Sequence, residues 1–101
     1  MEELAQWLKS QHKGLRTYKV FQQRVSEFAS QHPTHSALGS LLAMLVGRFV
    51  DSYEDSPLTL DVTDAAHRRL TAFAEKAAQF DRLSAEDRLK LLNEIAAAEL
   101  N

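Results

Sequence analysis

The chain of 101 residues is predicted to fold as an all-α bundle, a single domain over residues 1–101, with four to five short helices around a central apolar helix at about residues 35–53. Apolar residues recur at helical spacing along almost the whole chain, and no segment alternates long enough to predict a sheet. Hydrophobic residues make up 45% and charged residues 26%, the balance of an ordinary globular protein. A chain of this length has room for one core.

The first helix is predicted over about residues 2–12, where two glutamates in the first turn favour the helix dipole. The second is predicted over about residues 17–30 and ends before Pro33, because a proline disfavours helix at the residue that precedes it. Thr34 or His32 is expected to cap the helix that follows. The residues expected to face inward from these two helices are Leu4, Trp7, Leu8, Tyr18, Phe21, Val25, Phe28 and Ala29.

The third helix contains the most apolar stretch of the chain, ALGSLLAMLVGRFV at residues 37–50. Only 11 residues precede Arg48 in this stretch, whereas a membrane-spanning helix needs about 20. A membrane span is therefore excluded. On a helical wheel this segment is apolar over more than half of its circumference, so we expect it to be central.

Two glycines lie in that helix although each costs about 1 kcal/mol relative to alanine. They belong to a stripe of small residues, which predicts the close approach of another helix. Two partners are left open: the alanine-rich fourth helix of the same chain, or the third helix of a second subunit across a two-fold axis. We favour a homodimer, because four short neighbours leave part of the helix uncovered. The predicted helix-packing or dimer-interface residues are Ser36, Gly39, Ser40, Ala43, Gly47, Leu42 and Phe49.

The fourth helix is predicted to begin between Asp61 and Thr63 and to continue to about Asp81. The fifth begins after Ser84, with Asp87 three residues on in the manner of a capping box. The alternation in residues 58–62 leaves a short strand there as an alternative. The residues expected to face inward from these two helices are Val62, Ala66, Leu70, Phe73, Ala77, Phe80, Leu89, Leu92, Ile95 and Ala96.

The sequence carries no pattern that predicts catalysis, a cofactor or a metal site. Cysteine is absent, no Gly-x-Ser-x-Gly motif or glycine-rich phosphate loop occurs, and the chain has only three glycines. His32 and His35 have a spacing at which two imidazoles can share a metal, but no third or fourth ligand accompanies them. We therefore expect a protein that is not an enzyme. The absence of cysteine and of a secretory signal predicts a cytoplasmic location.

Charge is distributed unevenly along the chain. Residues 1–50 hold six basic residues against three acidic ones, whereas residues 51–101 hold six against eleven. Four of the basic residues cluster around the first connection and form a candidate partner-binding patch: Lys9, Lys13, Arg16 and Lys19.

These features predict a small regulatory, inhibitory or adaptor protein that acts by binding another protein, with charge complementarity between the partners. The first alternative is a nucleic-acid-binding module that uses the basic first and second helices to contact phosphates. The second alternative is a helical bundle that binds a small ligand or a metal ion. The sequence does not identify the protein partner.

Overall fold

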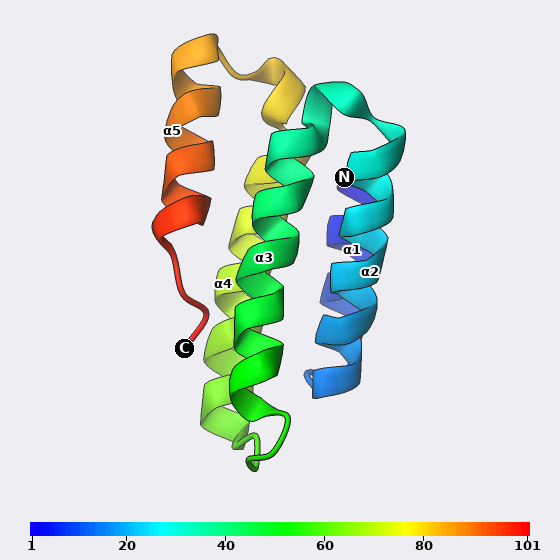
Figure 1. Ribbon diagram of the computed structural model, residues 1–101, viewed down its shortest axis with the longest axis vertical. Helices are drawn as coiled ribbons and strands as arrows, with labels where there is room; N and C mark the ends of the chain where they lie inside the picture. Colours follow the sequence, from blue (N-terminus) through cyan, green and yellow to red (C-terminus); the bar gives the residue numbers. More distant parts are fainter.

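The computed structural model describes all 101 residues and contains no strand, which confirms the predicted all-α fold (Figure 1). The elements are α1 (Glu2–Ser10), α2 (Leu15–Gln31), η1 (Pro33–His35), α3 (Ser36–Tyr53), α4 (Leu60–Ala78), η2 (Phe80–Arg82) and α5 (Ala85–Ala97), where η denotes a short 3-10 turn. None of the helices has an apolar stretch long enough to cross a lipid bilayer.

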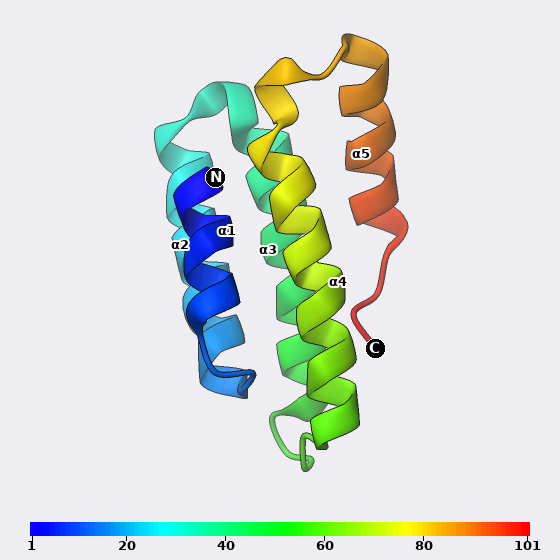
Figure 2. The same cartoon turned by 180° about the vertical axis from the view of Figure 1, so that it is seen from behind.

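The helices form two layers with α5 at one edge. The helices α2 and α3 pack closely in one layer and α1 packs on α4 in the other, as the front and back views show (Figures 1 and 2). On the opposite edge from α1 and α2, α5 packs against α3. The arrangement places α3 between α2 and α5, with α4 behind it, which confirms that the apolar third helix is central.

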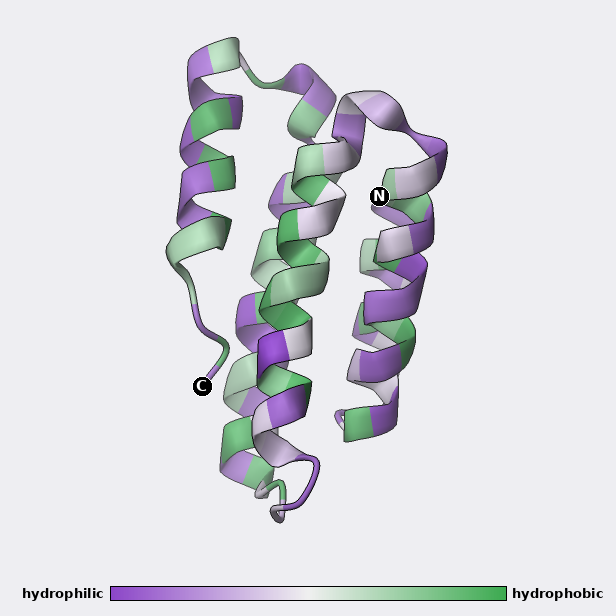
Figure 3. Ribbon diagram, in the orientation of Figure 1, coloured by the Kyte–Doolittle hydropathy of each residue, from purple (hydrophilic) through white to green (hydrophobic).

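The hydropathy of α3 explains this position. Apolar residues cover most of its surface (Figure 3), and seven of its residues are buried. The aromatic ring of Phe49 packs edge-on against Tyr18 of α2, with the ring centroids 5.1 Å apart. Of the large apolar residues of α3, Met44 alone is mainly exposed. The apolar face of α3 is wider than that of a surface helix, so neighbours on several sides are needed to bury it.

The connections differ from the sequence prediction at two points. Thr59 caps α4, because its hydroxyl accepts a hydrogen bond from the Val62 amide at 3.4 Å, and Leu60 is the first helical residue. The short strand left open at residues 58–62 therefore does not form. The expected capping of α3 by Thr34 or His32 is also wrong: Pro33 begins the turn η1, which leads directly into α3 without a side-chain cap.

The fifth helix begins where the sequence predicts, but its buried face was predicted only in part: Ile95 is buried and Leu92 partly buried, as predicted. Ser84 caps it by accepting a hydrogen bond from the Asp87 amide at 3.1 Å. Leu89, predicted to face inward, is 60% exposed, and Ala96 is exposed as well, whereas Leu91 and Ile95 are buried. Because the sequence has leucines at positions 89, 91 and 92, more than one face of α5 could have been the buried one. The contact with α3 buries Leu91 and Ile95, which lie four residues apart on one face.

A buried polar cluster ties the first connection to α4. The Tyr18 hydroxyl donates to the Thr63 carbonyl oxygen at 2.8 Å, and the Thr63 hydroxyl donates to the carbonyl oxygen of Lys13. Nearby, Nε2 of the buried His67 lies 3.0 Å from the Leu8 carbonyl oxygen, so this nitrogen carries the proton. These bonds satisfy buried polar groups and fix the position of α1 and α2 on α4.

Removing the Tyr18 hydroxyl tests this cluster. We expect Tyr18→Phe to lower the free energy of unfolding by about 1 kcal/mol, the usual net contribution of a buried hydrogen bond. Urea denaturation at pH 7 measures the change. Tyr53→Phe is the matched control, since Tyr53 is only partly buried and its hydroxyl meets Asn101 at 3.5 Å. Equal stability of wild type and Tyr18→Phe would show that the Tyr18 bond contributes nothing.

The same tyrosine predicts a pH dependence. Burial raises the pKa of the Tyr18 phenol and the nearby Asp64 carboxylate adds to the rise, whereas the hydrogen bond with Thr63 opposes it. In the unfolded chain the phenol loses its proton near pH 10. Above that pH the unfolded state therefore binds fewer protons than the folded state, and the free energy of unfolding falls. We expect Tyr18→Phe to lose stability less steeply than wild type above pH 10, and Tyr53→Phe to follow wild type.

Candidate functional site

The small-residue stripe of α3 packs within the chain, against α2. A Cβ atom added at Gly39 would lie 2.6 Å from the Ala29 Cβ and 3.1 Å from the Val25 carbonyl oxygen, so the helices touch there through their backbones. One added at Gly47 would lie 2.7 Å from the side-chain nitrogen of Gln22. The expectation that α4 fills the stripe is therefore wrong. That prediction rested on the alanines of α4, but α2 also has small residues, such as Ala29.

The other residues of the predicted interface divide into buried and accessible ones. Leu42 and Phe49 are buried in the core of this chain. Ser36, Ser40 and Ala43 line a shallow depression of about 360 Å³ between α3 and α2, and the Ser36 hydroxyl donates to the Ala29 carbonyl oxygen at 3.3 Å. Packing inside one chain thus accounts for both glycines, and the stripe requires no second subunit.

The predicted basic patch meets carboxylates from the acidic half of the chain. The pairs join Lys9 to Glu75 at 3.1 Å, Lys13 to Asp64 at 3.3 Å and Lys19 to Glu54 at 3.3 Å. All six side chains remain about half exposed, so each pair contributes little stability. Arg16 is exposed and forms no ion pair. The charges that are separated in the sequence are therefore adjacent in the fold.

The two histidines of the HPTH motif contact different groups. The His32 ring stacks on Phe28 with the ring centroids 4.3 Å apart. The Nε2 atom of His35 lies 2.8 Å from a carboxylate oxygen of Asp81, which joins η1 to η2. No three histidine or acidic side chains gather where they would hold a metal ion. The motif thus organises one end of the bundle.

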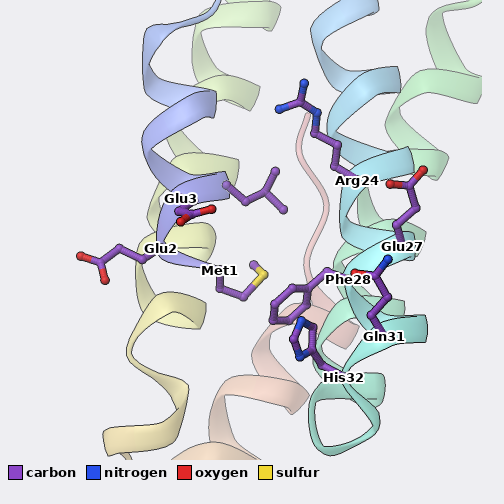
Figure 4. A pocket seen from close by; sticks show the side chains of 9 residues that line it. Met1, Glu2, Glu3, Arg24, Glu27, Phe28, Gln31 and His32 are labelled. Carbon is purple, nitrogen blue, oxygen red and sulfur yellow. The ribbon is translucent and has the colours of Figure 1, made fainter.

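A groove of about 600 Å³ lies between the start of α1 and the second half of α2. Three of its lining residues, Met1, Leu4 and Phe28, are apolar and half-buried, and we call them the floor of the groove. The ring of His32 lies beside Phe28 (Figure 4). We call this feature the α1–α2 groove. Its lining residues are Met1, Glu2, Glu3, Leu4, Arg24, Glu27, Phe28, Gln31 and His32.

The charges around the α1–α2 groove are mainly negative. Glu2 and Glu27 stand on opposite rims (Figure 4), and neither these two carboxylates nor that of Glu3 forms an ion pair. The one cation of the lining, Arg24, stacks over the ring of Trp7, with its guanidinium carbon 4.4 Å from the ring centroid. The groove therefore combines an apolar floor with carboxylates that have no ion-pair partner inside the chain.

Sequence reasoning did not find this groove. Leu4 and Phe28 were assigned to the core because they share helical stripes with buried residues, and Glu2 and Glu3 were attributed to the dipole of the first helix. Met1 and Glu27 were given no role. The sequence signal that could have indicated the groove was the position of Leu4 and Phe28 near helix ends. At a helix end, neighbouring helices cover the apolar stripe least completely. Two such half-covered ends form a groove only when the fold brings them side by side.

Comparison with models of protein families, with characterised proteins and with solved structures finds no match to this chain. The site is therefore interpreted from its geometry alone.

The two glycines of the stripe predict opposite effects of the same substitution. We expect Gly39→Ala to lower the free energy of unfolding by about 1 kcal/mol, because overpacking against the Ala29 and Val25 backbones outweighs the gain in helix propensity. Gly47→Ala is the matched control: the Gln22 side chain can move aside, so the gain of up to about 1 kcal/mol in propensity remains. Thermal and urea unfolding measure both changes. Equal effects of the two substitutions would contradict the packing described.

Proposed function

We propose that the protein is a non-catalytic cytoplasmic binding protein, of the regulatory, inhibitory or adaptor kind, that holds a segment of another protein in the α1–α2 groove. The observation that carries the proposal is the combination found there: an apolar floor bordered by three carboxylates that have no ion-pair partner. An exposed apolar hollow with a polar rim is typical of a surface that binds another macromolecule.

The partner segment that fits this groove is a short amphipathic helix with apolar residues on one face and lysine or arginine beside them. Apolar side chains would cover Leu4 and Phe28, and the flanking cations would meet Glu3 and Glu27. This is the helix-in-groove mode of peptide recognition. Since α1 has nine residues and is about 13 Å long, it accommodates two to three turns of a partner. Charge complementarity would mainly accelerate association and exclude acidic segments.

The nucleic-acid alternative receives less support from the same geometry. Three of the four residues in the basic patch pair with carboxylates, and those carboxylates would face the phosphates of a bound duplex. Phosphate contacts need cations whose charge is not already neutralised. Arg16 alone meets that condition in the patch, which favours a cationic protein partner over DNA or RNA.

The first test of the proposal uses the single tryptophan as its signal, since Arg24 of the groove stacks on Trp7. We expect a tryptophan-free amphipathic peptide of leucine and lysine to change the Trp7 fluorescence saturably, with an affinity that weakens as salt rises. A peptide with glutamate in place of lysine is the control and should not bind. Binding of an RNA or DNA duplex, with no response to the cationic peptide, would contradict the proposal.

A pair of charge-reversal variants locates the binding. We expect Glu3→Lys/Glu27→Lys to weaken binding of the leucine–lysine peptide about tenfold, since two exposed charge reversals together amount to about 1–2 kcal/mol. Asp55→Lys/Glu86→Lys changes the net charge equally at exposed carboxylates outside the groove. This control should bind like wild type. Equal weakening in both variants would mean that the peptide responds to net charge and not to the groove.

A further inference from the structure

Arg24 of the α1–α2 groove is held in place without using its hydrogen-bonding groups. Its guanidinium carbon lies 4.4 Å from the ring centroid of Trp7. Arg48, Arg69 and Arg88 donate hydrogen bonds to carbonyl oxygens of this chain, whereas Arg24 donates none and forms no ion pair. Contact with a ring occupies one face of a guanidinium and leaves its N–H donors free. Arg24 is therefore a fixed donor group with no acceptor inside the chain.

Charge changes sign along the groove. Because α1 and α2 run in opposite directions (Figure 2), the start of α1 lies beside the end of α2, whereas Trp7, further along α1, reaches Arg24. Figure 4 shows Arg24 at one end of the groove and His32 at the other, with the three carboxylates of the lining between them. Arg24 and Gln31, which mark this stretch of α2, are about 10 Å apart along the helix axis. The groove is thus positive at Arg24 and negative beyond it.

An α-helix has a polarity that matches this arrangement. Its first four amides and last four carbonyl groups have no partner inside the helix, and its peptide dipoles make the amino end positive and the carboxyl end negative. Carboxylates near the amino end and an arginine near the carboxyl end both stabilise a helix. The groove offers both in the order required by a helix that runs from His32 toward Arg24. A helix in the opposite direction would place its free amides against a guanidinium.

We propose that Arg24 determines the direction in which the partner helix binds, by donating hydrogen bonds to the carbonyl oxygens at its carboxyl end. This inference rests on the proposed function, because it requires a cationic amphipathic helix in the α1–α2 groove. The bound helix runs parallel to α1 and antiparallel to α2. Its lysine or arginine side chains lie in its middle turn, opposite the carboxylates, and none lies beside Arg24, where like charges would repel.

Short-range quenching of Trp7 measures the direction, because Trp7 is the single tryptophan and contacts Arg24. The probe is a tryptophan-free leucine–lysine peptide with blocked ends and its lysines in the middle turn, so that neither direction is favoured by side-chain charge. It carries a nitroxide quencher at its carboxyl or its amino end. We expect the carboxyl-terminal label to quench saturated protein about three times as strongly, the preference given by an exposed helix-dipole contact. Equal quenching, or stronger quenching by the amino-terminal label, would overturn the proposal.

Substitutions of Arg24 test its part in the preference. We expect the ratio of quenching by the two labels to fall toward one in Arg24→Gln and to be retained in Arg24→Lys, which keeps the charge. Arg68→Gln is the matched control, since Arg68 is exposed, lies outside the groove and makes no side-chain hydrogen bond or ion pair. It should give the wild-type ratio. An unchanged ratio in Arg24→Gln would overturn the proposal.

Fluorescence anisotropy of the same peptide with a fluorescein label distinguishes the two ways of failing. A peptide that binds, as anisotropy shows, but quenches Trp7 equally from both ends overturns the direction and leaves the proposed function standing. A peptide that does not bind overturns the proposed function, and the direction with it. We expect saturable binding together with the unequal quenching.

Discussion

The close approach of α3 to α2 at Gly39 is the contact on which the rest of the arrangement depends. With no side chain at that position, the two backbones come together at Ala29 and Val25, and α2 follows α3 along most of its length. The first helix is then left to pack mainly on α4, through residues that include the buried Leu8 and the hydrogen bond from His67. The missing side chain at Gly39 thus allows the close α2–α3 layer, and α1 and α4 form the second layer.

The α1–α2 groove is a consequence of this layering. Each of the two helices packs on a different member of the central pair, so α1 and α2 touch each other much less extensively than they touch their own layers. Their apolar stripes end at Leu4 and Phe28, where neither central helix covers them fully. A groove with an apolar floor results from ordinary core patterning, and the carboxylates at its rim have no cation from the other layer to meet.

Periodicity in the sequence predicted the five α-helices, because every helix carries an apolar stripe and Ser84 provides a clear cap. It did not predict the short turns η1 and η2. Periodicity did not predict which helices pack against one another. Small residues occur in both α2 and α4, so the stripe around Gly39 had two possible neighbours within the chain. In α5, the leucines at positions 89, 91 and 92 permitted several inward faces. The basic patch was found in the sequence, but its pairing with carboxylates more than 30 residues away depends on the fold.

The segment after α5 contains the residue that periodicity was least able to assign. Leu100 lies beyond the last helix, in a segment with no repeat to compare, yet it is buried against α3 and α4. The segment after α5 and the α1–α2 groove lie on opposite edges of the bundle (Figures 1 and 2). The segment after α5 therefore covers the edge of α3 that faces away from α2, whereas the groove at the other edge stays open.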